Sequence, residues 1–583
     1  MLILIPYYLA LGFFALTWGQ LPFWLLKLKK PENAFLDILF GTLILSIISL
    51  LFVIGGPINL LTQSIFVFCT LAIAFLQREE MMHRLNLLYS SFKQFSKTDF
   101  FILAAILIPV LYQSAQATKI NDNGGYYQPT IAWMEQVGLV KGLANIYPAL
   151  GLYSSWHSLT ALFDLNQLGL GSYHQINGFL FSFTILWLFR ELKLNIILRF
   201  KFILLGILVY IVLLGFFFLS APNADLPMIC YAGLLIYYLL YPKEDFHPLI
   251  WWLICFALFA IKPPASTALV ISILVVLKKN FSLKSKFNSL ILILPLVFIL
   301  IYKNVILSGY AIYPLNKPDI FKVEWKVPPN WNELYRVGIV SWGIQDKYEI
   351  KDWNTAKNEK QGRLTKWLFR SGYKGLMNKF LFLNFCLLIL LTLISYIKKR
   401  KLSWHILLLI LLLLIFQGIE WLYLSQYRLM LATGLSILLV NLYLVFQPDQ
   451  KWMNKIRKPQ LIQNGISLGL ILFLWLIAFV PFSMFANSSR NKSITKSEGF
   501  NTRYLIEPWH QFDNGPIHTN RFNNMVFYYY PERVYCWDCP LPCVSKSHHD
   551  FLLKNLGLEI SPLGNSIQDG FKLINKSTVD IKK

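Results

Sequence analysis

Charged side chains that could bind a substrate or move a proton stand beside apolar runs at four distant places in this sequence. Asp122 lies in the polar stretch Asn-Asp-Asn-Gly-Gly, and Asp225 ends the turn Pro-Asn-Ala-Asp. Lys262 precedes two prolines, and Arg428 lies in a short connection between apolar runs. A carboxylate is suited to act as a general base, and lysine and arginine are suited to bind phosphate. The simpler alternatives are helix caps for the two acids and an arginine that reaches the membrane surface.

The composition predicts a membrane protein. Of the 583 residues, 56% are hydrophobic and 14% are charged, and the mean hydropathy is +0.50. At this length such values indicate repeated apolar segments in one polytopic chain. The net charge of +24 arises largely in short loops between these segments, where lysine and arginine set the orientation in the membrane. This distribution argues against nucleic acid as a partner.

The apolar runs predict an all-α polytopic membrane protein with about 14 transmembrane crossings, some of them short or re-entrant. They lie at about 1–19, 35–54, 58–77, 99–115, 177–189, 201–219, 226–241, 249–277, 288–307, 378–397, 404–420, 429–446 and 462–483. The run 249–277 fits either one long helix or two short helices that meet at Lys262. Two helices keep every basic cluster on the cytoplasmic side, and consecutive prolines break a helix. We adopt this interpretation, which places all four charged candidates at the outer face and both termini outside.

Five parts follow from this topology, and the last of them is a small polar tail. They are the N-terminal helices 1–97, a core 98–307 with the outer loop 116–176, a periplasmic loop 308–377, the C-terminal helices 378–483, and the periplasmic tail 484–583. The tail contains Cys536, Cys539 and Cys543 within one short hydrophilic stretch. An exported location favours a disulfide between Cys536 and Cys543. A zinc site that includes His548 and His549 is the alternative.

Five further residues of the outer loop are candidates to line a substrate site: Tyr126, Tyr127, Glu135, Trp156 and His157. Glu135 falls on an amphipathic stretch and is expected on a solvated helix face. His157 could act as a base, but a lone histidine beside a tryptophan is more often structural. The sequence contains no Walker, Rossmann or zinc-protease motif and no evident acidic cluster for a metal, so the metal stays unknown.

The order of these motifs resembles the GT-C superfamily of integral membrane glycosyltransferases, which includes the dolichyl-phosphate-mannose protein mannosyltransferases. The motifs are the early acid Asp122, the Pro-x-x-Asp turn at Asp225, the Lys-Pro break at Lys262, Ser-Gly-Tyr-x-x-Tyr-Pro at 308–314, and Tyr-Arg at 427–428. The stretch from Asp122 to Trp156 and the tail from Tyr535 to Phe571 also look like an uncharacterised bacterial family of polytopic membrane proteins.

This resemblance implies an inverting glycosyltransferase that moves a sugar from a polyprenyl-phosphate donor to an acceptor at the periplasmic face of a bacterial inner membrane. It implies a GT-C-like core that begins near residue 98, with Asp122 as the general base and Asp225 as a secondary acid. Arg428 and Lys262 are the implied ligands of the lipid phosphate, whose charge grows in the transition state. No cofactor is firmly implied, although a divalent metal is compatible. The acceptor is a glycan, a lipid or a protein.

A non-catalytic transporter of lipid-linked or soluble glycans is the competing hypothesis, and a polysaccharide polymerase or ligase is a third. Transporters tend to have repeated halves with interrupted helices near the middle of the membrane. Here the one interrupted segment has no visible counterpart, and the polar candidates collect at one face. The sequence therefore favours an enzyme.

Reporter fusions test the predicted topology. Fusions at residues 340 and 540 should report the outer side of the membrane, because the basic loops that flank their helices are expected to stay in the cytoplasm. A fusion at residue 195, within a basic loop, is the cytoplasmic control. Cytoplasmic activity at either 340 or 540 would refute the topology.

Overall fold

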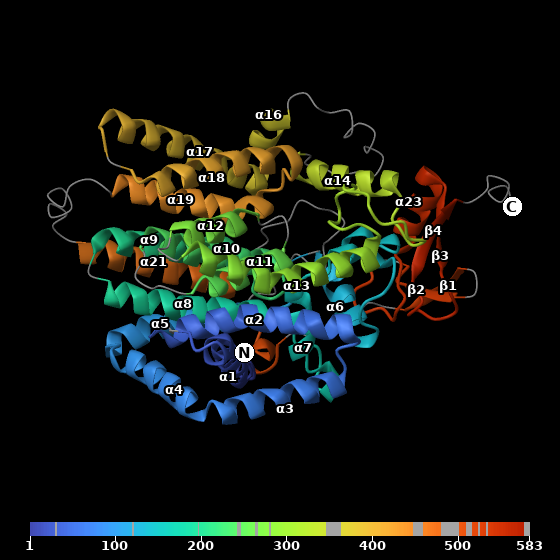
Figure 1. Ribbon diagram of the computed structural model, residues 1–583, viewed down its shortest axis with the longest axis horizontal. Coiled ribbons are helices and arrows are strands. Elements are labelled where there is room, and N and C mark those ends of the chain that lie inside the picture. Colours follow the sequence, from blue (N-terminus) through green and yellow to red (C-terminus); the bar gives the residue numbers. More distant parts are fainter. Residues whose placement is uncertain are drawn as a thin grey trace.

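The computed structural model describes residues 1–28, 32–118, 120, 122–195, 197–241, 247–262, 266–278, 282–344, 363–400, 402–446, 459–479, 501–508, 516–522, 525–531 and 535–575. Within these residues the chain is mostly helical, as predicted, and most of the long helices run side by side in one bundle (Figure 1). Four features of the sequence analysis lie outside them: Asn121, Pro263, Pro264 and the basic loop 451–458.

Each predicted apolar run forms one or two helices over most of its described part. The helices are α1 (Leu4–Leu25), α2 (Ala34–Gly55), α3 (Leu60–Leu76), α5 (Lys97–Ala115), α8 (Ile176–Leu194), α9 (Leu198–Tyr210), α10 (Asp225–Leu240), α11 (Pro248–Ile261), α12 (Ser266–Lys278), α13 (Leu283–Ser308), α17 (Gly372–Ile397), α18 (Trp404–Tyr423), α19 (Leu431–Val445) and α21 (Pro459–Phe479). Shorter or polar helical segments are α4 (Arg78–Lys93), η1 (Asn123–Tyr127), α6 (Gln128–Gln136), η2 (Leu143–Asn145), η3 (Pro148–Leu152), α7 (Ser155–Phe163), η4 (Asn166–Leu168), η5 (Ile211–Gly215), η6 (Phe216–Phe218), α14 (Pro329–Ile344), α16 (Arg363–Leu368), η8 (Tyr427–Met430), α22 (Arg503–Ile506) and α23 (Lys546–Leu556).

The lengths of these helices define a multi-pass membrane protein. Eight helical segments of the described chain are long and apolar enough to cross a membrane. A ninth is added if α3 and α4, which are bent by 87° at their junction, count as one span. Two of the other apolar helices, α10 and α11, are shorter than a full span. The count of about 14 crossings therefore stays a prediction.

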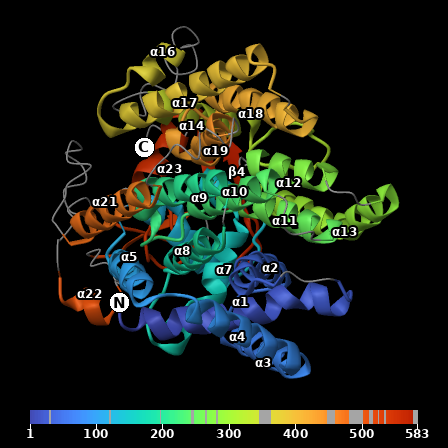
Figure 2. The ribbon, with the colours of Figure 1, turned by 90° about the vertical axis from the view of Figure 1, so that its left-hand side faces the viewer.

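The chain breaks at Lys262, as the two-helix interpretation predicted. α11 ends at Ile261, α12 begins at Ser266, and the two helices pack against each other (Figure 1). The Ser154 hydroxyl donates a hydrogen bond of 2.6 Å to the carbonyl of Ile261, which satisfies a carbonyl at the open end of α11. Figure 2, which looks along the bundle, shows α10 near its centre with α12 and α19 beside it.

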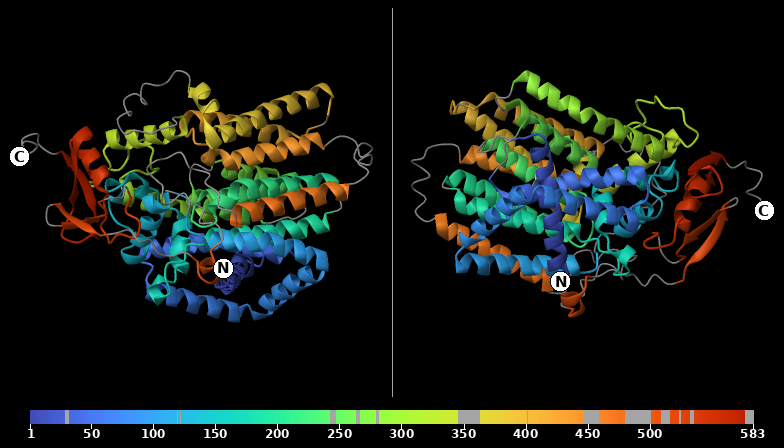
Figure 3. Two further views of the ribbon diagram at one scale, coloured as in Figure 1. Left: turned by 180° about the vertical axis from the view of Figure 1, so that it is seen from behind. Right: turned by 60° about the horizontal axis from the view of Figure 1, so that its bottom comes forward.

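A small α+β unit at one end of the bundle was not predicted from the sequence (Figures 1 and 3). Its strands are β1 (His518–Phe522), β2 (Met525–Tyr529), β3 (Leu558–Pro562) and β4 (Phe571–Asn575), paired as two antiparallel hairpins, β1 with β2 and β3 with β4. Phe571 at the start of β4 is fully buried, and its ring lies 6.0 Å from that of Trp133 in α6. The all-α description thus holds for the bundle, and the tail adds β-structure that packs on the outer loop.

Two glycines let α1 cross closely over α2 (Figure 3). A Cβ atom on Gly41 would lie 1.7 Å from the carbonyl oxygen of Ala15, and a Cβ atom on Gly19 would lie 2.4 Å from that of Asp37. Small residues at helix interfaces allow such backbone approach in membranes, where packing rather than the hydrophobic effect drives association.

Gly41→Ala should therefore lower the stability of the folded protein, because the added methyl group forces α1 away from α2. The expected loss is about 1–3 kcal/mol, as for other overpacked cores, and thermal unfolding in detergent measures it. Gly418→Ala in α18 is the matched control, since a Cβ atom there meets nothing within 4 Å. Equal unfolding midpoints for the two variants would contradict the close crossing.

Candidate functional site

The structure brings the four predicted charged residues together in two ion pairs. Arg428 Nη1 contacts Asp122 Oδ2, and Lys262 Nζ contacts Asp225 Oδ1. Lys262 also lies within electrostatic range of Arg428 and Asp122, so the pairs form one group, which we call the charged cluster. The side chains of Arg428, Asp122 and Lys262 are 23%, 26% and 19% exposed, whereas Asp225 is 4% exposed. The cluster is thus half-buried and balances two cations against two carboxylates.

Neither acid caps a helix, which removes the simpler interpretation of both. The Asp122 carboxylate accepts no capping hydrogen bond, although the residue stands directly before η1, a π-helical turn. Asp225 is the first residue of α10, and its backbone N–H donates to Asn223 Oδ1 at 2.6 Å. The side chain of Asn223, and not that of Asp225, therefore accepts the hydrogen bond from the backbone at the start of α10. Both carboxylates are left to face cations, and π-turns of this kind are frequent at functional sites.

A buried chain of polar side chains holds the two acidic segments in place. Asn223 Nδ2 donates to the Tyr127 hydroxyl at 2.7 Å, which joins the turn before Asp225 to the loop after Asp122. Asn177 Nδ2 donates to the carbonyl of Asn223 at 3.0 Å, and Trp156 Nε1 donates to Asn177 Oδ1 at 2.7 Å. Trp156 and Tyr127, both predicted to line a substrate site, are buried members of this support. Satisfied polar networks of this type rigidify a site.

Arg428 is oriented by the turn between α18 and α19 and by α14. Gln426 Oε1 accepts a hydrogen bond of 3.0 Å from Arg428 Nε, and Gln426 Nε2 donates to the carbonyl of Ile339 at 2.9 Å. Ser425 adopts a left-handed φ of +51°, and a Cβ atom on Gly343 of α14 would lie 2.1 Å from its carbonyl oxygen. Only glycine permits α14 to approach this strained turn. The guanidinium is thereby aimed at Asp122.

Besides Tyr127, three tyrosines from separate segments lie within electrostatic range of Asp122: Tyr126, Tyr335 of α14, and Tyr535 of the tail. Burial raises the pKa of Tyr535 to about 12 and raises the pKa values of the other two further. The three hydroxyls therefore stay protonated and can only donate or accept hydrogen bonds. Sequence reasoning missed Tyr335 and Tyr535. The only signal was the Gly124-Gly125 pair, which permits close approach by a partner such as Tyr535.

Behind the cluster lies a second acidic pair, and it corrects the prediction for Glu135. Glu135 is 5% exposed rather than solvated, because α6 is covered by α7 and by the tail. Burial raises the pKa of Glu135, and its neighbour Asp164 adds to the rise. Burial acts in the same direction on Asp164, but His174, 3.2 Å away, outweighs it and lowers the pKa of Asp164. Of the two carboxyl groups, Glu135 is therefore the one that favours the protonated form.

His157 is buried against the ring of Tyr127, 5.0 Å away between ring centroids. Burial lowers the pKa of His157 to about 3, and the nearby charges of His174 and Lys262 act in the same direction. The imidazole therefore stays neutral and is a weak base. This supports the structural interpretation of the residue over the catalytic one.

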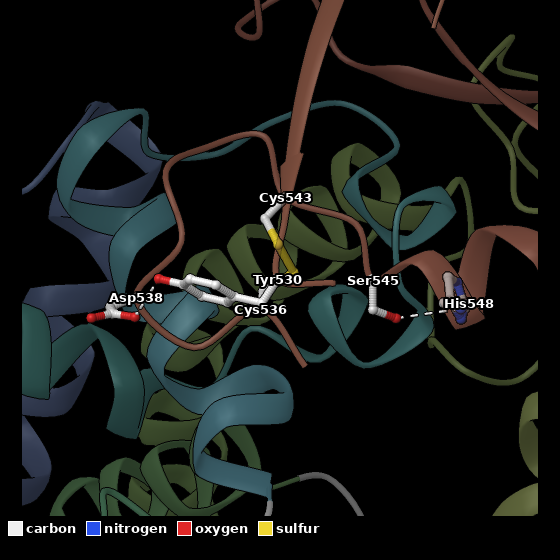
Figure 4. Close-up of a disulfide and its surroundings, with 6 residues drawn as sticks. All are labelled: Tyr530, Cys536, Asp538, Cys543, Ser545 and His548. Carbon is white, nitrogen blue, oxygen red and sulfur yellow. Dashed lines mark hydrogen bonds between the residues drawn. A yellow bond between two sulfur atoms is a disulfide. The ribbon is translucent and has the colours of Figure 1, made fainter. Parts of the chain in front are cut away.

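The tail forms the predicted disulfide between Cys536 and Cys543 (Figure 4). The zinc alternative is wrong, because two of its three thiolate ligands are bonded to each other. Among the described residues no group of three His, Cys, Asp or Glu side chains is placed to bind a metal ion.

The fold and this site define a multi-pass membrane protein with a charged cluster at one end of its helix bundle. The chain belongs to a family described as a domain of unknown function, DUF8201, whose family model matches residues 1–435. The matched range contains the whole charged cluster and ends before the tail. No curated protein and no solved structure matches the chain.

Glu135→Gln should flatten the dependence of stability on pH. An unfolded glutamate releases its proton near pH 4.5, whereas folded Glu135 keeps it to higher pH. Because the folded state binds more protons, the free energy of unfolding falls as pH rises above about 4.5. The Glu135→Gln side chain has no proton to release, so this fall in the free energy of unfolding should disappear. Its amide still offers a hydrogen-bond donor to Asp164. The measurement is the change in thermal unfolding midpoint between pH 5 and pH 8. The control is Glu79→Gln, since Glu79 is exposed. If both variants lose the same stability between these pH values, the raised pKa of Glu135 is contradicted.

Proposed function

We propose that this protein is a GT-C-type glycosyltransferase that transfers a sugar, with inversion, from a polyprenyl-phosphate donor to an acceptor at the periplasmic face of a bacterial inner membrane. The observation that carries the proposal is the charged cluster, to which four distant segments each contribute one residue. Charges near a membrane bundle are costly to desolvate, so their convergence calls for a function. Neither a helix cap nor a lipid-facing arginine requires it.

The two cations of the cluster are suited to hold the lipid phosphate. The guanidinium of Arg428 offers a planar fork of donors for phosphate oxygens, and Lys262 adds a compact positive charge beside it. Both side chains are partly exposed, so a phosphate can reach them. As the bond to the sugar breaks, negative charge builds on the phosphate, and cations fixed at that place lower the barrier.

Asp122 is the proposed base. Its carboxylate takes the proton of an acceptor hydroxyl, and the acceptor oxygen forms a bond to the anomeric carbon. The bond from that carbon to the phosphate oxygen breaks, and its electron pair leaves with the polyprenyl phosphate. Inversion requires the incoming oxygen and the leaving phosphate on opposite faces of the sugar. The contact between Arg428 and Asp122 is therefore the substrate-free arrangement, and the donor phosphate replaces Asp122 as the partner of Arg428.

Substituting the base tests the proposal. Purified protein in liposomes is supplied with a polyprenyl-phosphate sugar and candidate acceptors, and release of polyprenyl phosphate is measured. Asp122→Asn should lower the rate about 100-fold or more, the range usual for loss of a general base. Arg428→Ala should raise the donor KM and lower the rate. Asp319→Asn is the matched control, since this acid is exposed and pairs with Lys326 away from the cluster.

Two outcomes would contradict the proposal. Full turnover by correctly inserted Asp122→Asn protein rules out the base. Passage of labelled lipid-linked sugar across the liposome membrane without release of polyprenyl phosphate instead supports the transporter hypothesis.

A further inference from the structure

A short loop of the tail, residues 535–544, rests directly on the backbone that follows Asp122. The backbone N–H of Trp537 donates to the carbonyl of Gly124 at 3.0 Å. A Cβ atom on Gly124 would lie 2.0 Å from the Trp537 ring, and one on Gly125 would lie 3.5 Å from the Tyr535 ring. The first of these two glycines is thus needed because an indole occupies the space where a side chain would be. We call residues 535–544 the tail loop.

The tail loop is itself held at both ends. The disulfide between Cys536 and Cys543 closes the loop near both of its ends (Figure 4). In the sequence, Trp537 lies within the closed segment. The last part of the tail loop joins β2, because Tyr528 N–H donates to the carbonyl of Pro542 at 2.9 Å and Val544 N–H donates to that of Tyr528 at 3.2 Å. Trp537 adopts a left-handed φ of +50°, a conformation that persists only where the surroundings fix it.

This contact lies two residues from Asp122. η1, which carries Gly124, is a π-helical turn that runs directly into α6, so Asp122 lies at the free end of this helical segment. On its inner side Tyr127 of η1 accepts a hydrogen bond from Asn223, and on its outer side the carbonyl of Gly124 accepts one from the backbone N–H of Trp537. Tyr535 also lies within electrostatic range of Asp122. Loss of the tail loop would remove the support on the outer side of η1, and only the Tyr127–Asn223 hydrogen bond and the ion pair with Arg428 would then remain of the contacts described above.

We propose that Trp537 and Tyr535 are positioning residues for Asp122, and that the Cys536–Cys543 disulfide keeps them on the Gly124-Gly125 backbone. The proposal rests on the function proposed above, and it makes the tail a part of the site. Both tail residues lie beyond the range that matches the family model. The site of this chain is then completed by a segment outside its family domain.

A labelling experiment tests the contact without any assumption about function. Gly125→Cys, placed in a background in which Cys69, Cys386 and Cys539 are alanine, is reacted with a membrane-impermeant maleimide in the full-length protein. Trp537→Ala and the double variant Cys536→Ser/Cys543→Ser should each increase the labelling rate several-fold. Trp537→Phe should restore slow labelling, because an aromatic ring again packs on Gly124 and keeps the tail loop, with Tyr535, over residue 125. Tyr529→Ala, a tail aromatic that faces His518, is the matched control.

Turnover of the polyprenyl-phosphate sugar supplies the second readout. Trp537→Ala should lower kcat at least about tenfold through displacement of Asp122, with the donor KM unchanged and with rescue by Trp537→Phe. Gly124→Ala should produce the same two effects from the opposite side of the contact, which guards against a tail variant that merely misfolds. An unchanged labelling rate overturns the proposal, as does fast labelling with unchanged kcat. If the labelling rate increases but even the parent protein shows no turnover, the contact is supported and the proposed function is contradicted.

Discussion

The pairing of charges at the end of a membrane bundle is the constraint on which the rest of this structure depends. Asp122 and Asp225 cannot be desolvated alone without a large penalty, so each requires a cation. Those cations are supplied by Lys262, at the break after α11, and by Arg428, in the turn before α19. The two pairs therefore join the outer loop, the start of α10, the broken helix pair and the late helices. A change at any one residue leaves a charge without its partner, which costs more than the pair itself contributes.

The charged cluster is held by ion pairs, whereas the buried polar groups that support it are mostly neutral and hydrogen-bonded. Asn177, Asn223 and Tyr127 connect through uncharged contacts, and Glu135 keeps its proton beside Asp164. His157 is likewise neutral. The side chains that carry the cations are the partly exposed ones, where a phosphate can reach them. This division between a neutral buried support and an accessible charged surface is what a site for an anionic substrate requires.

Part of this arrangement could be predicted from the sequence, and part could not. Apolar length predicted the helices, the prolines predicted the break at Lys262, and the basic loops placed four charges at one face. The choice of ion-pair partners depends on tertiary distances that no spacing reveals. Glu135 was expected to be exposed to solvent because its helix is amphipathic. The residue is buried instead, because α7 and the tail cover α6. The hairpins of the tail were missed because their strands are only five residues each.

The contact between Arg428 and Asp122 has a consequence for the order of events. While the two side chains are paired, the Asp122 carboxylate and the Arg428 guanidinium each occupy the place that a substrate group would take on the other. In the proposed reaction, a donor phosphate that binds Arg428 replaces the Asp122 carboxylate there and frees that carboxylate to face the acceptor hydroxyl. Under that proposal, donor binding and release of the base are one physical event. The proposed site would then keep its base engaged with Arg428 until the sugar to be transferred is in place.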